Sequence, residues 1–306
     1  MTRHISIIIP VYRNTTLFLH NLEVNKPFIK DCEVIVINDY PQDDITYAVN
    51  QIVPQSKVIL HTTTKGFGQT INDGVAKATG QYVLFLNTDV TFDSARFKES
   101  VHLFEKNPKL FAVSYAQKDQ ENNIHGGNKG SFNNGFIRHS KRSTSVLSPN
   151  LWAEGGSMIC RKDLFVKFQG FDQLYSPFYE EDKDLSYVAW KSGYMVLFDP
   201  SIVVNHNHGS TIGSYFQKTK IKTIAHRNLF IFHWKNITDT SFFYKHLLSL
   251  PKMIVSTLIQ GDVTFFIGFF QALIRFPTIM AQRHNQEKYF IKTDEDILSQ
   301  FKTNDT

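Results

Sequence analysis

The sequence predicts an α/β fold with a parallel sheet and a ligand cleft along one edge of that sheet. In the first ninety residues, short β-branched runs alternate with a segment of helical periodicity, which is typical of strand–helix–strand units. Two of the apolar runs end abruptly in an acidic residue, at Asp39 and Asp89. Because open α/β sheets bind ligands beyond the C-terminal ends of their strands, these two carboxylates mark the predicted cleft.

Four strands and one helix are predicted in this N-terminal block. The strands are the apolar runs bounded by polar turns, over Ile5–Val11, Glu33–Asn38, Lys57–His61 and Tyr82–Leu86. The helix is predicted over residues 68–79, where Ile71, Val75 and Ala78 recur at helical spacing. A strand–helix–strand order of this kind requires crossover helices that cover the faces of the sheet.

Two later segments depart from that pattern. Residues 117–149 are rich in Asn, Gly, Ser, Lys and Arg, which predicts a long loop that serves as a lid or a binding segment. A second ordered block is expected from Trp152 to about Ser210.

The C-terminal part, from Ser241 to Phe290, contains two apolar stretches separated by Gly261-Asp262. Each is shorter than the ~20 residues that a bilayer span needs, so the pattern predicts two amphipathic helices. We expect them either to pack on the preceding domain or to lie in a membrane interface. The alternative is an ordinary helical hairpin that closes the core or forms a dimer contact.

Composition narrows the class of protein. A hydrophobic share of 42% and a charged share of 20% are ordinary for a folded soluble chain. The formal charge of +5 and the pI near 9.0 suit a phosphate-bearing ligand or an anionic membrane surface, and they are too weak to indicate nucleic acid. Cys32 and Cys160 lack metal-ligand spacing and form no disulfide framework, which favours a reducing cytoplasm. The first apolar run is too short for a signal peptide and is read as a strand.

The two strand-end carboxylates suit different parts of a nucleotide. Asp89 follows a buried strand as the last residue of Asn87-Thr88-Asp89, where a carboxylate suits a hard divalent cation and hence a phosphate group. Asp39 is placed to accept the imide N–H of a uracil or thymine base, although a turn role is the alternative for each. Lys65 and Gly66 open the next helix, where Lys65 faces either a diphosphate or solvent.

A second acidic cluster, with Glu181, Asp182 and Asp184, begins a later predicted helix. The helix dipole alone favours acids at this position, and the alternative is a carboxylate that deprotonates a hydroxyl nucleophile. His206 and His208 follow a predicted strand in a Gly-Ser turn, where a neutral imidazole can complete the shell of a divalent metal. A structural or solvated histidine is the alternative.

The order of these motifs is more specific than any one of them. It comprises Ile8–Tyr12, Val36–Asp39, Gly66–Gly68, Asn72–Gly74, Leu86–Asp89, Gly155–Met158 with Arg161, Gly170–Asp172, Glu181–Leu185, His206, Arg227-Asn228 and Lys235-Asn236. This series resembles glycosyltransferase family 2, and in particular its bacterial rhamnosyltransferase-like and galactofuranosyltransferase-like members. The resemblance spans roughly residues 5 to 236.

The resemblance implies a GT-A fold, a Rossmann-like mixed sheet with helices on both faces, followed by a C-terminal helical extension. The implied catalytic domain covers residues 1–236, with a donor half of about 1–116 and an acceptor half of about 150–236. Residues 237–306 form the amphipathic helical region.

The resemblance also implies a role for each site residue. Asp182 is the implied general base, with Glu181 and Asp184 in support, and Asp89 and His206 are the implied ligands of Mg²⁺ or Mn²⁺. The implied contacts of the nucleotide sugar are Pro10, Tyr12, Asp39, Lys65, Gly66, Asn72, Asn87, Trp152, Gly155 and Gly156.

The implied reaction is an inverting, single-displacement transfer from a dTDP- or UDP-sugar, with rhamnose the favoured sugar, to a glycan or polyprenyl-linked acceptor. The Gln-x-x-Arg-Trp motif of processive synthases is absent, so one sugar is expected per encounter. We expect a cytoplasmic protein, peripheral at the inner face of the cell membrane, with a homo-oligomer as an open option.

The chain departs from the family pattern at two points. Asn87-Thr88-Asp89 provides one carboxylate where two aspartates are usual, and Tyr40–Asp44 replaces the small turn that usually follows the second strand.

Two other functions compete with this interpretation. A sugar nucleotidyltransferase is disfavoured because its Gly-rich triphosphate loop is absent. A catalytically silent scaffold or glycan-binding protein is disfavoured because Asp89, Asp182 and His206 are all retained.

Overall fold

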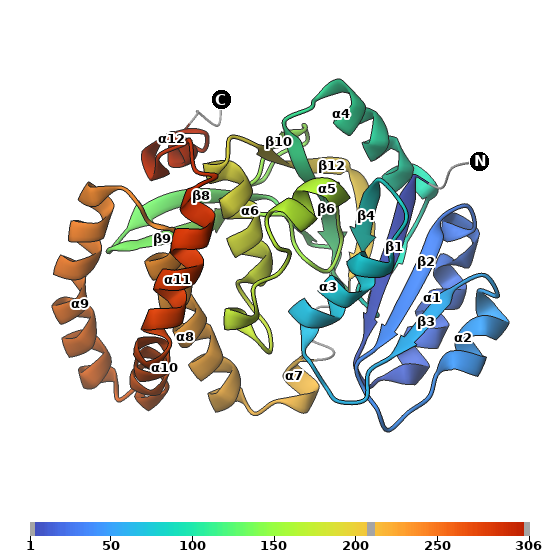
Figure 1. Ribbon diagram of the computed structural model, residues 1–306, viewed down its shortest axis with the longest axis horizontal. Helices are drawn as coiled ribbons and strands as arrows, with labels where there is room; N and C mark the ends of the chain where they lie inside the picture. Colours follow the sequence, from blue (N-terminus) through green and yellow to red (C-terminus); the bar gives the residue numbers. More distant parts are fainter. Residues whose placement is uncertain (1–3, 207–211, 303–306) are drawn as a thin grey trace.

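The computed structural model describes residues 4–206 and 212–302, and it shows a central sheet covered by helices (Figure 1). Within the described residues, ten strands form one sheet with the path β10-β12-β6-β11-β4-β1-β2-β3. Strand β5 pairs with β12 and β7 pairs with β6, while β8 and β9 form a separate hairpin. The predicted α/β class with a mixed sheet is confirmed.

The strands and helices have the following bounds. The strands are β1 Ile5–Val11, β2 Glu33–Asn38, β3 Lys57–Leu60, β4 Tyr82–Phe85, β5 Val90–Phe92, β6 Leu110–Lys118, β7 Ile124–His125, β8 Asn128–Asn133, β9 Phe136–Lys141, β10 Ser148–Pro149, β11 Met158–Arg161 and β12 Met195–His206. The helices are α1 Thr15–Ile29, α2 Thr46–Ile52, α3 Phe67–Lys77, α4 Ser100–Lys106, α5 Lys162–Lys167, α6 Glu181–Lys191, α7 Ile212–Tyr215, α8 Lys218–Asn236, α9 Thr240–Gln260, α10 Val263–Ile274, α11 Phe276–Glu287 and α12 Asp294–Ser299.

The N-terminal half of the sheet is parallel, as its strand–helix order predicts. Strand β1 lies between β2 and β4 and runs parallel to both. Ile8 packs in the core on one face of the sheet, whereas Ile7 and Ile9 pack in the core on the other face. Both faces of β1 are therefore buried, which explains why its sequence is a continuous apolar run.

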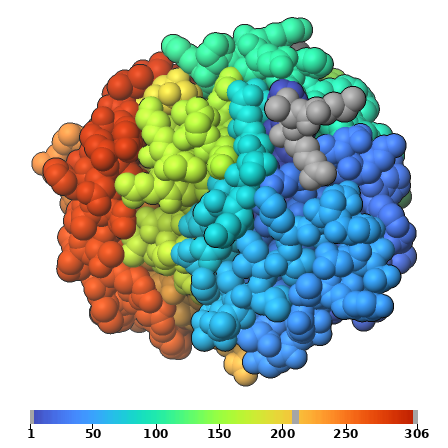
Figure 2. All heavy atoms as spheres, turned by 45° about the vertical axis from the view of Figure 1, so that its right-hand side comes forward, coloured from blue at the N-terminus to red at the C-terminus, as the bar shows by residue number. Residues whose placement is uncertain are grey.

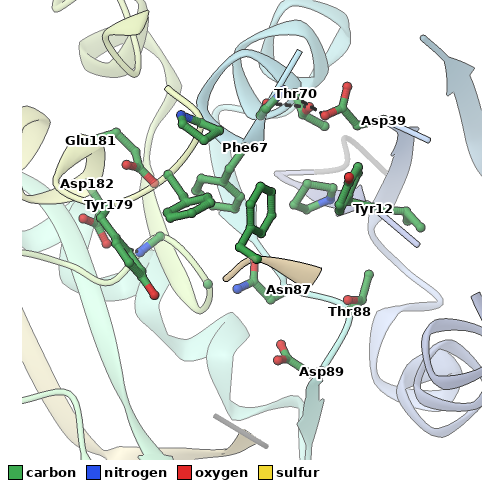
Figure 3. A pocket seen from close by; sticks show the side chains of 18 of the residues that line it. Tyr12, Asp39, Phe67, Thr70, Asn87, Thr88, Asp89, Tyr179, Glu181 and Asp182 are labelled. Carbon is green, nitrogen blue, oxygen red and sulfur yellow. Dashed lines mark hydrogen bonds between the residues drawn. The ribbon is translucent and has the colours of Figure 1, made fainter. Parts of the chain in front are cut away.

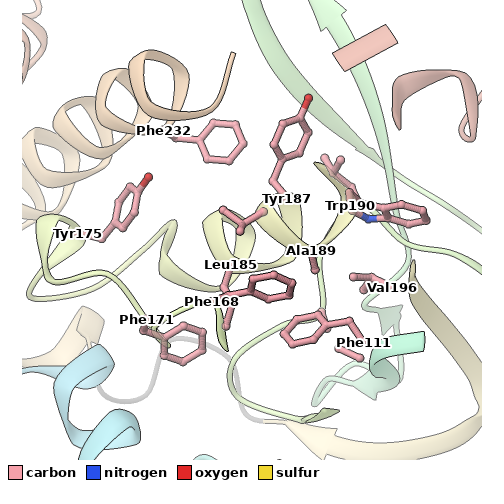
Figure 4. Close-up of a cluster of buried hydrophobic side chains, with 14 of the residues drawn as sticks. Phe111, Phe168, Phe171, Tyr175, Leu185, Tyr187, Ala189, Trp190, Val196 and Phe232 are labelled. Carbon is pink, nitrogen blue, oxygen red and sulfur yellow. The ribbon is translucent and has the colours of Figure 1, made fainter. Parts of the chain in front are cut away.

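Helices cover each face of this sheet. Helix α3 contributes Ile71 and Val75 to one core, and α1 contributes Phe18 and Leu22 to the other. Gly74 of α3 lies so close to the strands that an added Cβ would come within 2.5 Å of a methyl group of Ile8. The first of these cores extends around α6, where large aromatic side chains surround the helix (Figure 4).

The second half of the sheet is mixed and brings distant segments together. Strand β11 runs antiparallel to both β4 and β6, and β12 runs parallel to β6. The end of β12 pairs with β5 in a register that places His206 opposite Val90. This register brings the end of β12 beside the residue that follows Asp89.

The long loop expected over residues 117–149 is wrong in part, because this segment contains the β8–β9 hairpin. The hairpin turns at Asn134 (φ 49°) and Gly135 (φ 79°), a pair that suits a two-residue turn with positive φ at both positions. Phe136 packs edge-on against Phe230 and His233 of α8, with ring centroids 5.6 and 4.5 Å apart. Tertiary packing therefore orders strands whose composition is that of a loop.

The C-terminal region contains more helices than the two expected. Pro251 lies inside α9 without ending it, and α9 ends at Gly261, whose φ is 65°. Helix α10 packs on α8 through Gly268, where an added Cβ would lie 2.7 Å from the carbonyl oxygen of Thr223. The space-filling view shows these C-terminal helices, in orange and red, on the opposite side from the blue N-terminal segment (Figure 2). The domain boundary at residue 236 remains a prediction.

The helices do not include a clear membrane span. Among the described residues, no single helix is long and apolar enough to cross a bilayer. Helices α10 and α11 meet that criterion only as a pair, and they are bent by 61° relative to each other.

Candidate active site

A cavity of about 470 Å³ lies beyond the C-terminal ends of β1, β2 and β4, within the size range of small-molecule sites. The predicted residues Pro10, Tyr12, Asp39, Gly66, Asn87, Asp89, Gly155, Gly156, Glu181, Asp182 and His206 line it. In Figure 3, Asp39 and Tyr12 lie on one side, Glu181 and Asp182 on the other, and Asn87, Thr88 and Asp89 between them.

Asp39 organises one wall of the cavity. Its Oδ1 accepts hydrogen bonds from the backbone N–H of Lys65 and from Nδ1 of His61, both at 2.8 Å. Its Oδ2 accepts from the backbone N–H of Gly66, also at 2.8 Å. The carboxylate therefore fixes the turn that opens α3, and it also lines the cavity, where a carboxylate oxygen can accept a further hydrogen bond.

Aromatic rings flank Asp39. The ring of Tyr12 meets those of Tyr40 and Tyr215 edge-on, with centroids 5.9 and 6.3 Å apart. The guanidinium of Arg13 lies 5.0 Å from the ring centroids of both Tyr40 and Tyr215. This cation–π cluster ties α7 to the end of β1.

The Asn87–Asp89 turn is held from two sides. The backbone N–H of Asn87 donates to the carbonyl of Gly156 at 2.9 Å, and the side-chain amide of Asn21 donates to the carbonyl of Thr88 at 2.8 Å. An added Cβ at Gly156 would lie 2.6 Å from Nδ2 of Asn87, so a larger residue there would displace the Asn87 side chain. Asp89 is thereby fixed at the floor of the cavity.

Asp89 and His206 form a pair whose chemistry suits a divalent cation. The Oδ1 of Asp89 and Nε2 of His206 are 3.4 Å apart. Nδ1 of His206 lies 2.6 Å from Oε1 of Gln117, which can only accept, so Nδ1 carries the proton. In the neutral form with the proton on Nδ1, the ring directs the lone pair of Nε2 toward Asp89, which is the tautomer that a metal-binding histidine needs. No group of three or more candidate ligand side chains exists in the described ranges 4–206 and 212–302, so a cation there would need further ligands from phosphate or water.

Gln117 is itself held by side chains that the sequence analysis did not single out. Its Nε2 donates to Oε2 of Glu154 at 2.5 Å and to Oγ of Ser157 at 2.8 Å. Burial, followed by the charge of Asp182, raises the pKa of Glu154. Glu154 directly precedes the Gly155-Gly156 turn, and this position is the sequence feature that could have indicated its place near the site.

Buried Glu181 and partly buried Asp182 form an acidic pair at the start of α6. Oδ2 of Asp182 accepts the backbone N–H of Gly155 at 2.9 Å, and Oδ1 accepts that of Lys183 at 2.8 Å. Burial raises the pKa of Asp182, and these two N–H groups oppose that rise. Burial, and then the charge of Asp182, raises the pKa of Glu181 well above its ordinary value.

Asp184, which is predicted to support Asp182, does not line the cavity. Its Oδ2 accepts from Nζ of Lys235 at 2.6 Å, and its Oδ1 accepts from Tyr175 and Asn236. It is a buried link between α6 and α8. Asp184 lies three positions after Glu181, and the difference in surroundings comes from α8, which no local pattern predicts.

Three predicted nucleotide-sugar contacts also lie outside the cavity lining. Nζ of Lys65 pairs with Asp73 at 2.7 Å. The side-chain amide of Asn72 exchanges two hydrogen bonds with the backbone of Phe171, at 2.8 and 2.9 Å, and so fastens α3 to the loop before α6. Trp152 packs edge-on against His139. The predicted ligand His208 falls outside the described residues.

Other residues line the cavity without having been predicted. They are Val11, Thr64, Phe67, Thr70, Thr88, Pro177, Phe178, Tyr179, Gly213, Phe216 and Ile221. Most are apolar or come from segments far from any motif, so a pattern of charged residues gives no signal for them.

Comparison with known proteins supports the same family. The sequence model described as Glycosyl transferase family 2 matches residues 6–168, more than half of the chain. A chain named an uncharacterized glycosyltransferase of Rickettsia bellii is 29% identical over 151 residues, which are 48% of this chain and 22% of that protein. A similarly named protein of Rickettsia felis is 29% identical over 120 residues, 38% of this chain and 20% of its own. These matches span about a fifth of the length of the curated relatives.

Solved structures show the same fold at low sequence identity. GalNAc-T7, crystallised with UDP, GalNAc and Mn²⁺, has a TM-score of 0.58 at 15% identity, over 78% of this chain and 49% of its own. The mannosyltransferase PcManGT of Pyrobaculum calidifontis, in complex with GDP-Man and Mn²⁺, has a TM-score of 0.55 at 13% identity, over 94% and 85%. Residues 1–349 of TarS from S. aureus give a TM-score of 0.56 at 14% identity, over 96% and 88%. The likeness confirms the GT-A fold.

Proposed function

The chain belongs to glycosyltransferase family 2, and on that premise we propose that it transfers one sugar from a nucleoside diphosphate sugar to an acceptor hydroxyl with inversion. The observation that carries this proposal is the shared cavity. A carboxylate beside a tyrosine cluster, an Asp–His pair and the acidic pair Glu181 and Asp182 all line it. In that order, these three elements suit the nucleobase of the donor, its diphosphate with a bound cation, and the acceptor hydroxyl.

Asp182 is the proposed general base. Two backbone N–H groups hold its carboxylate in one orientation, and burial raises its pKa toward the range in which a carboxylate accepts a proton readily. The acceptor oxygen forms a bond to the anomeric carbon while the bond from that carbon to the diphosphate oxygen breaks. The acceptor proton goes to Asp182, and the electron pair leaves with the diphosphate.

Asp89 and His206 are the proposed ligands of Mg²⁺ or Mn²⁺, a cation that neutralises charge on the diphosphate when it is bound. The fit rests on the oxygen and nitrogen donors of these residues and on the tautomer that Gln117 imposes on His206. Two structural neighbours crystallised with Mn²⁺ support the choice of metal.

We further propose a dTDP- or UDP-sugar as donor, with rhamnose as the first sugar to test, and a lipid-linked or surface glycan as acceptor. Asp39 and Tyr12 are the proposed contacts of the base, and Pro10, Gly66, Asn87, Gly155 and Gly156 are proposed to line the rest of the nucleotide-sugar site. The absence of the Gln-x-x-Arg-Trp motif from the sequence supports a non-processive transfer.

The test is the thermal stability of the purified chain with UDP, dTDP, GDP or CMP, each with and without Mn²⁺. A ligand at about 100 times its dissociation constant stabilises the folded state by about 2.7 kcal/mol, which is measurable as a melting shift. We expect one pyrimidine nucleoside diphosphate to stabilise the chain in a Mn²⁺-dependent manner, and we expect Asp89→Asn to remove that dependence.

Asp31→Asn is the control, because Asp31 is an exposed aspartate that pairs with Lys98 outside the cavity. It should leave the shift unchanged. No shift with any of the four nucleotides would contradict the proposal and favour a catalytically silent scaffold.

A further inference from the structure

Helices α9 and α10 carry apolar residues on their solvent-facing sides. Along α9, exposed residues recur at spacings of three or four, or multiples of these, which places them on one side of the helix. Tyr244, Leu248, Val255 and Ile259 show this spacing, and Phe243, Leu247 and Leu258 are exposed beside them. The same spacing holds along α10 for Val263, Ile267, Phe270 and Ile274, beside which Leu273 is also exposed. We call the eight residues that share this spacing the apolar stripe.

The residues of the apolar stripe are largely exposed, and they are grouped on one side of each helix instead of being scattered over the surface. Leu248 and Ile259 are 79% and 81% exposed, whereas Phe242, His246 and Thr257 are the buried residues of this 21-residue helix. Figure 1 shows α9 at the outer side of the molecule, with α10 and α11 between it and the sheet. Exposed apolar side chains that are grouped on one side of a helix mark an interaction site.

The charges beside the apolar stripe restrict its partner. Between residues 240 and 286 the acidic residue is Asp262, and the cations are Lys245, Lys252, Arg275 and Arg283. Asp262 is already paired, with Nζ of Lys222 at 2.8 Å. Lys245 and Lys252 are exposed on α9 itself. The surface is therefore apolar with a basic border, which is the composition that binds an anionic lipid surface.

A second copy of the chain fits this surface less well. A two-fold dimer places the same patch on both sides of the interface, so Lys245 and Lys252 would face a partner surface of the same charge without acidic residues to pair with. Anionic lipid head groups provide the missing negative charge.

We propose that the apolar stripe docks the protein on an anionic lipid bilayer, with α9 and α10 lying in the interface. Lys222, which pairs with Asp262 in the turn between these helices, directly follows Ile221, which lines the cavity. The docking surface is thus linked through one ion pair to the rim of the active site. Given the proposed function, on which this step rests, the docked protein presents its cavity to acceptors that are anchored in the same membrane.

The experiment is cosedimentation of the full chain with vesicles of phosphatidylcholine alone and of phosphatidylcholine with phosphatidylglycerol. We expect binding to the anionic vesicles that weakens as salt is raised. Leu248→Ser combined with Ile259→Ser should weaken binding by at least about tenfold, because two large apolar side chains no longer enter the interface. Lys245→Glu combined with Lys252→Glu should also abolish the preference for anionic vesicles.

Tyr47→Ser is the matched control, because Tyr47 is 78% exposed on α2 at the far side of the molecule (Figure 1). It should bind vesicles like the unmodified chain. Circular dichroism melting of each variant checks that the fold is retained.

Two results would overturn the docking proposal. One is a lack of binding to either vesicle, or equal binding by the apolar-stripe variant and the control. The other is a dimer in sedimentation velocity that the Leu248→Ser, Ile259→Ser variant loses, which assigns the stripe to a second copy. Vesicle binding without any nucleotide-dependent melting shift would instead retain the docking surface and contradict the proposed enzyme function.

Discussion

Two glutamates, Glu33 and Glu181, are almost equally shielded from solvent, at 4% and 6% exposure, and yet their carboxyl pKa values are shifted in opposite directions. Glu33 begins β2 and accepts hydrogen bonds from Ser6, Lys57 and Thr79. Burial alone raises the pKa of Glu33, but these donors outweigh burial and lower it to about 2. Glu181 begins α6, and its Oε2 has no hydrogen-bond partner in the described part of the chain.

The comparison shows that hydrogen-bond donors and the depth of burial together decide what a buried carboxyl group does. At Glu33 the protein provides a cation and three neutral donor groups, so the charged form is stabilised and fastens β1, β2 and β3 together. At Glu181 the protein provides no comparable set of hydrogen-bond donors. The neighbouring charge of Asp182 raises the pKa of Glu181 further. Unfavourable burial of this kind is concentrated at functional sites, where stability is exchanged for reactivity.

The largest expected effect is the loss of turnover in Asp182→Asn. The amide keeps the size of the side chain but cannot accept the acceptor proton, so we expect the rate to fall about 10²- to 10⁴-fold. The measurement is initial rate of sugar transfer together with the nucleotide-dependent melting shift, which should persist because the donor site is intact.

Glu180→Gln is the control for this variant. Glu180 precedes the acidic pair but binds Nζ of Lys183, and it does not line the cavity. It should retain the rate at neutral pH. An unchanged rate in Asp182→Asn would exclude Asp182 as the base.

The second-largest expected effect concerns Glu33, which has a structural role. Glu33→Gln should lower the free energy of unfolding by about 2 kcal/mol at neutral pH, because charge-assisted hydrogen bonds are replaced by neutral ones. The pKa of Glu33 is lower in the folded chain than its ordinary value of 4.5, so its contribution is complete above that value and is lost as pH falls toward 2. Urea unfolding at pH 7 and pH 4 measures this, and a difference between variants that grows on acidification would contradict it.

Glu181→Gln should change the free energy of unfolding in the opposite direction and by a smaller amount. The pKa of Glu181 is raised in the folded chain, so its charge destabilises the fold at neutral pH and this cost disappears below its ordinary value of 4.5. We expect the variant to be more stable than the unmodified chain by about 1 kcal/mol at pH 7. Thermal melting at pH 7 and pH 4 checks this, and destabilisation at pH 7 would show that Glu181 is satisfied in a way that resembles Glu33.

The same contrast explains how far the sequence predicts this site. Asp39, Asp89 and His206 were predicted at the ends of strands, and the structure places all three in one cavity because parallel strands end at the same edge of a sheet. Asp182 and Asp184 were predicted as parts of one acidic cluster, and the structure places them in different surroundings. The roles of these residues remain predictions.

What the sequence did not predict depends on contacts between distant segments. Asn72 forms hydrogen bonds with Phe171, 99 residues away, and Asp184 with Lys235, 51 residues away. Glu154 is linked to His206 through the side chain of Gln117. Local periodicity carries no information on such partners, so residues with catalytic character and residues with structural roles look alike in the sequence.

The smallest expected effect concerns the pH dependence of the reaction. Asp182 must be unprotonated to act as a base, and burial raises its pKa, so activity should be lost on acidification at a higher pH than an ordinary aspartate would give. The negative charge of Glu180 also raises the pKa of Asp182. Glu180→Gln should therefore move the acid limb of kcat/KM to slightly lower pH while leaving the rate at neutral pH unchanged. A pH–rate profile of both proteins measures the shift, and movement of the limb to higher pH would mean that the titrating group is not Asp182.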